Sequence, residues 1–286
     1  MREVSRRRCR WLGREEKQRV VGRLPAFSRS LGLDVIITDA GTPVLVELQH
    51  GFGRRGLICL FPEASRQYRK TYWQLRRECG RSYFAAEEIR RVCSDKICTY
   101  RHFGRHQPRS LVYHRWDSTV ESWLDELSSS YVLVKPPRGS CGTGILVFDR
   151  SALRRSGGAW TLGNPPLLLQ EFIRSRALLD DKGDAHLGCI RHIVVIRSDG
   201  EEASTIHLPP YWRVSPEPVT SEHPDREALT ANISRGAYPI PVSETDAEVV
   251  RRFADGIIDE LLRLIFRIGE LRWGPSRVVS SLGEVP

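Results

Sequence analysis

A lysine followed by a glycine-rich segment is the first feature of this sequence that could bind phosphate. Residues 131–149 predict two strands joined by a turn, with Lys135 at the end of the first strand. Glycine lets a backbone fold closely over an anion, and lysine adds positive charge. A Walker A loop is excluded because GxxxxGK[ST] is absent and a strand follows. The same pattern also fits an ordinary glycine-rich hairpin. The candidate phosphate-binding residues are Lys135, Arg138, Gly139, Ser140, Gly142, Thr143 and Gly144.

Two acids on a predicted hairpin could bind a metal ion. Asp34 begins one apolar run and Glu47 ends the next, around the turn cluster Asp-Ala-Gly-Thr at 39–42. Gln49 follows two residues beyond Glu47 and offers an amide oxygen. Mg²⁺ prefers such oxygen ligands and usually shares them with phosphates. Two solvated acids on a hairpin are the alternative.

An apolar strand at 167–173 ends in polar residues that could contact adenine. Gln170, Glu171, Phe172 and Ile173 are the candidates, since backbone groups and a carboxylate can read the edge of the base. Asp180, Asp181 or Asp184 could follow onto the ribose, and we select Asp181 among them. Taken alone, this segment is better explained as a core strand with a polar end.

Three arginines in the C-terminal half could hold phosphate oxygens. Arg191 opens an apolar strand, Arg213 follows it, and Arg235 lies in the segment Asn232-Ile-Ser-Arg-Gly. Arginine binds phosphate in a bidentate manner.

The elements that must position these residues alternate between helices and strands, which predicts an α+β chain. Helices are expected at 14–31, 64–78, 86–93, 118–128 and 244–267. Strands are expected at 34–47 (a hairpin), 57–62, 83–84, 111–114, 131–135, 167–173, 190–197 and 203–208, and 209–231 is expected to be irregular.

In their order along the chain, these features resemble the ATP-grasp superfamily. Lys96 resembles its first nucleotide lysine, and Lys135 with its loop resembles the second lysine and phosphate loop. The segment 170–173 resembles the interlobe strand that reads adenine. The family's metal hairpin normally comes last, whereas here it comes first, so the chain resembles a circular permutation. Gln49 replaces the family's Asn, and Cys189 stands near a position that is often acidic.

The resemblance implies an ATP-grasp fold of two α+β lobes preceded by a small α/β unit. The expected parts are 1–53 (metal hairpin of the C-lobe), 54–92 (small α/β unit), 93–166 (N-lobe) and 167–286 (C-lobe).

It also implies a ligase that uses ATP and Mg²⁺. A carboxylate of a small molecule or peptide would attack the γ-phosphate of ATP and form an acyl phosphate. An amine would then displace phosphate and form an amide or peptide bond. Specialised metabolism is the setting that the resemblance suggests. Arg191, Arg213 and Arg235 would act on the transferred group, and Asp34, Glu47, Gln49 and Asn232 would bind metal. A kinase, a carboxylate–thiol ligase and a non-catalytic nucleotide-binding protein of the same fold remain alternatives.

Composition limits the remaining function classes. The net charge is +9, but basic residues are spread along the chain, so we do not expect nucleic acid as the partner. No apolar run reaches the length of a membrane helix, and no secretory signal is evident, so we expect a cytoplasmic protein. The seven cysteines have irregular spacing, which favours reduced thiols. A homodimer is the default assembly.

Overall fold

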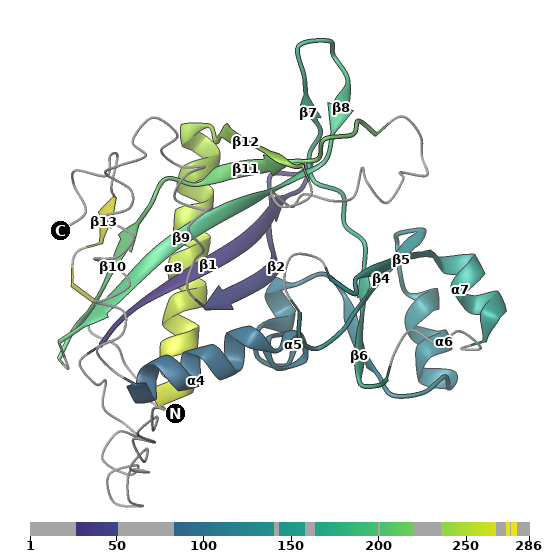
Figure 1. The fold of residues 1–286 in the computed structure, drawn as a ribbon, viewed down its shortest axis with the longest axis horizontal. Coiled ribbons are helices and arrows are strands. Elements are labelled where there is room, and N and C mark those ends of the chain that lie inside the picture. The colour runs from purple at the N-terminus through teal and green to yellow at the C-terminus, as the bar shows by residue number, and fades with distance from the viewer. Residues whose placement is uncertain are drawn as a thin grey trace, which may run out of the picture.

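The computed structural model of the protein describes residues 27–50, 83–139, 143–157, 164–199, 201–219, 236–266, 273–274 and 276–278. It combines two mainly antiparallel sheets with helices, which confirms the predicted α+β class. A long hairpin, β7–β8, extends away from both sheets (Figure 1). The helical elements are α4 (Tyr83–Ser94), α5 (Lys96–Phe103), η1 (Gly104–His106), α6 (Ser118–Asp125), α7 (Arg150–Ser156) and α8 (Glu244–Phe266).

The larger sheet is built around β1 and β9. Strands run in the order β12-β11-β9-β1-β2, and β10 pairs with β9 and with β13. The strand β1 pairs antiparallel with both β9 and β2, so the N-terminal hairpin lies in the same sheet as segments more than half the chain away. The strands of this sheet are β1 (Phe27–Ile37), β2 (Pro43–His50), β9 (Gly188–Ser198), β10 (Ala203–His207), β11 (Tyr211–Val214), β12 (Tyr238–Pro241) and β13 (Arg277–Val278).

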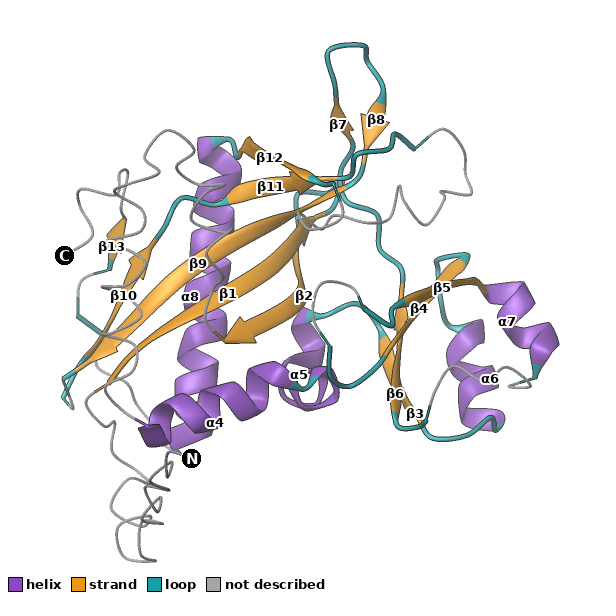
Figure 2. Ribbon diagram, viewed as in Figure 1, coloured by secondary structure: helices purple, strands orange, loops and turns teal. Residues whose placement is uncertain are grey.

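The long helix α8 covers one face of the larger sheet (Figure 2). Alternate residues of β1, namely Leu31, Leu33 and Val35, are fully buried in one core with Ile257 and Leu261 of the helix. A strand presents every second side chain to the same face, so the intervening residues of β1 must point away from α8. The opposite face is therefore free to carry polar groups.

The smaller sheet has the order β3-β6-β4-β5 and is covered by α6 and α7. Val132 and Val134 of β4 pack with Trp123 and Leu124 of α6, so the next residue, Lys135, falls on the other face. Helix α5 contacts β2 of the larger sheet and β6 of the smaller one. The remaining strands are β3 (Ser110–Tyr113), β4 (Tyr131–Lys135), β5 (Leu146–Asp149), β6 (Leu167–Glu171), β7 (Leu178–Leu179) and β8 (Ala185–His186).

Several predicted elements differ from the structure. The helix expected at 14–31 is wrong over residues 27–31, which belong to β1. The strand expected at 83–84 is the start of α4, and the region 209–231 contains the strand β11. Helix α7 was not expected, although Asp149 caps its start and Gly157, with φ 53°, ends it. The elements expected at 14–26, 57–62 and 64–78 lie outside the described residues.

The two sheets follow the predicted domain boundaries only in part. Residues 27–50 pair, through β1, with β9 of the region 167–286. Strand β6, which the boundaries assign to the C-lobe, pairs with β3 and β4 in the smaller sheet. Among the helices that the structure describes, none has an apolar stretch long enough to cross a membrane.

Candidate functional site

Side chains from four adjacent strands form a row on the face of the larger sheet opposite α8. Asp34 of β1 is paired with Glu47 of β2 on one side and with Arg191 of β9 on the other. Arg213 of β11 is paired with Cys189, two residues before Arg191. A β-bulge between Asp34 and Val35 keeps the two acids opposite each other. The predicted site residues of both chain halves thus meet on one surface.

Asp34 is the centre of this row. Its oxygens accept hydrogen bonds from Arg191 Nε at 2.5 Å and Arg191 Nη2 at 3.0 Å, which is the bidentate geometry of a strong pair. Arg213 Nη2 lies 2.8 Å from Asp34 Oδ2. Arg213 Nη2 also donates to Cys189 Sγ at 2.7 Å. One buried carboxylate therefore fixes two guanidinium groups.

Gln49 and Glu47 extend the row to the sheet edge. Gln49 accepts a hydrogen bond from Arg191 Nη1 at 2.9 Å and donates one to Glu47 Oε2 at 2.9 Å. The partner of Gln49 on β1 is Gly32, so no side chain of β1 stands at that position between Gln49 and β9. Both functional ends of the Gln49 amide are thus engaged by protein groups.

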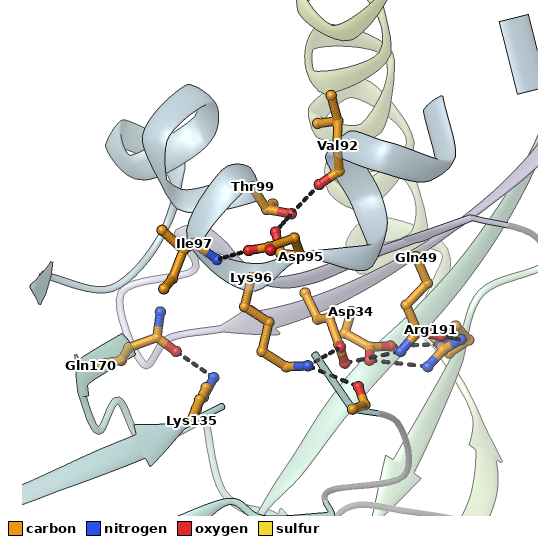
Figure 3. A network of polar contacts seen from close by, with 12 residues as sticks. Asp34, Gln49, Val92, Asp95, Lys96, Ile97, Thr99, Lys135, Gln170 and Arg191 are labelled. Carbon is orange, nitrogen blue, oxygen red and sulfur yellow. Dashed lines mark hydrogen bonds and ion pairs between the residues drawn. The ribbon is translucent and has the colours of Figure 1, made fainter. Parts of the chain in front are cut away.

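Lys96 joins the row to the glycine-rich segment. Its Nζ lies 3.3 Å from Glu47 Oε1 and donates to the carbonyl of Gly139 at 2.9 Å. The backbone N–H of Lys96 donates to Pro137 O at 2.8 Å, and Asp95 caps the start of α5 beside it. Figure 3 shows Lys96 reaching from α5 toward Asp34 and Arg191.

Lys135 approaches the same region from the smaller sheet. Its Nζ donates to Gln170 Oε1 at 2.5 Å (Figure 3). Gln170 Nε2 in turn donates to Ser110 Oγ at 3.0 Å. A small pocket lies between the two sheets and α5. Its lining residues are Val46, Glu47, Leu48, Lys96, Thr99, Gln107, Lys135 and Leu168.

The charges of this cluster do not cancel. Four cationic side chains face two carboxylates. Burial lowers the pKa of Lys135 to about 8, partly opposed by Glu47, so this lysine is still largely protonated at neutral pH. Burial raises the pKa of the Cys189 thiol, which therefore stays neutral. Burial opposes ionisation of Asp34, but Arg191 and Arg213 hold its pKa below the ordinary value. The site is therefore suited to an anion.

The glycine-rich loop is described at both ends. Gly139 has φ 145° and Gly144 has φ 74°, and a Cβ at Gly144 would lie 3.1 Å from Pro136 Cγ. Both positions therefore favour glycine. Arg138 is exposed and lies 3.8 Å from Asp95, and Thr143 is exposed. Two of the predicted loop residues, Ser140 and Gly142, lie outside the described residues.

The predicted adenine and ribose contacts are not all in this cluster. The Glu171 carboxylate accepts hydrogen bonds from the backbone N–H groups of Ser128 and Ser129, on the side of α6. The N–H of Phe172 donates to Tyr131 O, so it is engaged in the smaller sheet. Ile173 follows directly and is half-buried.

Asp181 is exposed in the turn of the β7–β8 hairpin. Asn232 and Arg235 lie outside the described residues. Their predicted roles, like those of Glu171, Phe172, Ile173 and Asp181, stay predictions.

The sequence did not predict the contacts that three further residues make in this cluster. Ser110 holds Gln170, Asp95 caps α5, and Cys189 shares Arg213 with Asp34. The Ser-Asp-Lys start of a helix is a capping signal that pointed to Asp95. Nothing in the sequence separates Ser110 or Cys189 from other residues of their types, because their contacts depend on strand pairing.

The predicted metal ligands differ in how well they fit a cation. Both Asp34 oxygens already bind arginine, and the Gln49 oxygen binds Arg191. Glu47 is more accessible, with 28% of its side chain exposed. Over the described ranges, no group of three or more His, Cys, Asp or Glu side chains is placed to hold a metal ion. Of the predicted ligands that the structure describes, Glu47 therefore has the most accessible carboxylate, although Lys96 and Gln49 contact its oxygens.

Comparisons of the sequence with models of known protein families and with curated proteins found no match.

Proposed function

We propose that the chain is an ATP-grasp carboxylate–amine ligase that forms ADP. The observation that supports this most is that Lys96 and Lys135 line one pocket between the two sheets, beside Glu47, which is linked through Gln49 to the cluster of Asp34, Arg191 and Arg213. These cations outnumber the nearby carboxylates, so a polyanion such as the triphosphate of ATP would complete the charge balance. The placement of the N-terminal hairpin beside β9 supports the permuted arrangement.

Each side chain has a role that follows from its place. Lys96 and Lys135 would hold phosphate oxygens, since one approaches from α5 and the other from the smaller sheet. Arg191 and Arg213 would stabilise the charge on the phosphoryl group as the substrate carboxylate attacks it. The resulting acyl phosphate would react with an amine and release phosphate. Catalysis of this kind depends on positioning rather than on a covalent nucleophile.

Mg²⁺ would neutralise charge between neighbouring phosphates. Glu47 would be its ligand from the described part of the chain, because the carboxylate is partly exposed. Lys96 and Gln49 orient this carboxylate.

We expect Mg-ATP to raise the thermal stability of the protein. One-site binding adds roughly 2.7 kcal/mol when the ligand is about a hundredfold above Kd. Lys135→Met should lose this stabilisation, and Glu47→Ala should lose the difference between Mg-ATP and ATP with EDTA. Glu201→Ala, which changes an exposed acid, is the matched control. No shift for wild type at millimolar Mg-ATP contradicts the proposal, whereas a shift justifies assaying carboxylates and amines for ADP release.

We also expect ATP affinity to fall as pH rises above about 8. The free protein carries the Lys135 charge below this pKa and loses it above, so each further pH unit weakens binding by up to about tenfold. Lys135→Arg should flatten the profile because arginine stays charged. Titration calorimetry between pH 7 and 9 measures this, with Lys182→Arg in the exposed β7–β8 turn as control. A wild-type affinity that is flat to pH 9 contradicts a phosphate role for Lys135.

A non-catalytic nucleotide-binding protein is the second candidate. It is favoured by Asp34 and Gln49, whose oxygens bind Arg191 and are not open to a metal. Stabilisation by Mg-ATP without ADP release across a panel of carboxylates and amines would support it.

A further inference from the structure

We propose that Asp34 is a positioning residue, which orients Arg191 and Arg213 toward a phosphoryl group and does not bind a metal ion. This inference rests on the proposed function, because the phosphoryl group would belong to the nucleotide. It departs from the metal role predicted for Asp34, and the departure follows from the contacts of this carboxylate.

The oxygens of Asp34 are directed at arginine. Oδ1 accepts from Arg191 Nε at 2.5 Å, and Oδ2 lies within 3.0 Å of nitrogens of both Arg191 and Arg213. The side chain is only 4% exposed. A metal ion would have to displace charged, bidentate partners in a buried place, where each cation left without its counter-ion is costly.

Additional contacts fix the same two guanidinium groups. Gln49 accepts from the far side of Arg191, and Cys189 accepts from Arg213. Arginine has no acceptor atom, so all of these contacts are made through N–H groups of a rigid planar fork. Fixing the fork before a ligand arrives lowers the entropy lost on binding.

One buried donor points to an anion as the missing partner. Arg213 Nε is buried and has no hydrogen-bond partner among the described residues. An unsatisfied buried donor on a charged group is unfavourable, and an oxyanion would satisfy it. Asp34 alone cannot neutralise two arginines, so the pair retains positive charge for that anion.

The test compares metal-free anion binding with metal-dependent binding. Binding of tripolyphosphate is measured by calorimetry in EDTA and in Mg²⁺ for wild type, Asp34→Asn and Arg213→Gln. Asp39→Asn, an exposed acid in the turn of the same hairpin, is the matched control. Temperatures are chosen at which circular dichroism shows every variant folded, so a loss of stability alone does not change the measured Kd.

We expect Asp34→Asn to weaken tripolyphosphate binding in EDTA by at least about tenfold, the effect of one charged hydrogen bond. The ratio of affinities with and without Mg²⁺ should stay as in wild type. If the Asp34→Asn variant binds tripolyphosphate normally in EDTA but loses the enhancement by Mg²⁺, Asp34 is a metal ligand and the inference is overturned. Unchanged binding in both conditions would overturn it as well, and so would tighter binding, which would mean that the charge of Asp34 matters more for the anion than its orientation of the arginines.

Arg213→Gln carries the test if Asp34→Asn does not fold, because it keeps the pair of Asp34 and Arg191. Arg213→Gln should weaken tripolyphosphate binding in EDTA and leave the ratio of affinities with and without Mg²⁺ unchanged. Normal binding of this variant in EDTA would overturn the inference. Wild type that binds tripolyphosphate but not Mg-ATP removes the ligase proposal and leaves the positioning role intact. Wild type that binds neither removes both.

Discussion

Asp34→Ala should lower the free energy of unfolding by about 3–5 kcal/mol, the range for breaking a buried ion pair. The side chain of Asp34 is 4% exposed and is the shared counter-ion of Arg191 and Arg213, each with 12% of its side chain exposed. Its removal leaves two cations close together with too little water to solvate them. Their mutual repulsion adds to the loss of the bonds to Asp34.

Equilibrium unfolding in denaturant measures this change. Asp39→Ala is the control, because it removes an exposed acid from the same hairpin and should change stability by less than about 0.5 kcal/mol. A loss below about 1 kcal/mol for Asp34→Ala would mean that the arginines find other partners, and the central place of Asp34 in the cluster would be wrong.

Acid should destabilise the protein through His192, well above the pH at which carboxylates titrate. Burial, and next His207 and Arg251, lower the pKa of His192 to about 3. In the unfolded chain, His192 binds a proton below about pH 6.5, whereas in the folded protein it stays neutral until the pH approaches 3. Stability is therefore complete above pH 6.5 and falls by about 1.4 kcal/mol per pH unit from there toward pH 3.

The geometry explains why His192 resists protonation. His192 Nε2 lies 2.9 Å from His207 Nδ1, and His207 Nε2 lies 3.1 Å from Asp255 Oδ1 of α8. Donation along this chain toward Asp255 leaves His192 Nδ1 as an acceptor. That atom is buried and has no hydrogen-bond partner in the part of the chain that the structure describes.

Denaturant unfolding at pH 6.5 and pH 5 tests this prediction. The fall in the free energy of unfolding between these two pH values should be smaller in His192→Leu, because leucine cannot titrate. It should be retained in His114→Leu, which removes an exposed histidine. Equal slopes for wild type and His192→Leu would show that His192 does not control the acid sensitivity.

The sequence by itself determined most of the local structure around the site. Two apolar runs around the turn cluster at 39–42 predicted the hairpin, and β3, β4, β6 and α8 lie close to their predicted ranges. Local signals suffice there, because periodicity and turn residues act over a few positions. Helix α8 also begins as expected, since Ser243 Oγ accepts from the N–H of Asp246.

Residues 27–31 show where local signals fail. Their apolar spacing favoured a helix, but pairing with β9 on one side and, at Leu31, with β2 on the other makes them part of β1. Tertiary pairing overrides propensity when both neighbours supply hydrogen bonds. Helix α7 was missed because its seven residues carry too short a pattern to detect.

The role of Asp34 was decided by tertiary structure alone. From the sequence, Asp34 could be a metal ligand or a solvated acid, and both interpretations depend only on its neighbours in the hairpin. Arg191 is 157 positions away, and only the order of strands in the sheet places it and Arg213 against this carboxylate. Burial then made that contact strong, since charges removed from water must be paired. Sequence thus selected these charged groups as candidates, and the sheet determined which of them bind one another.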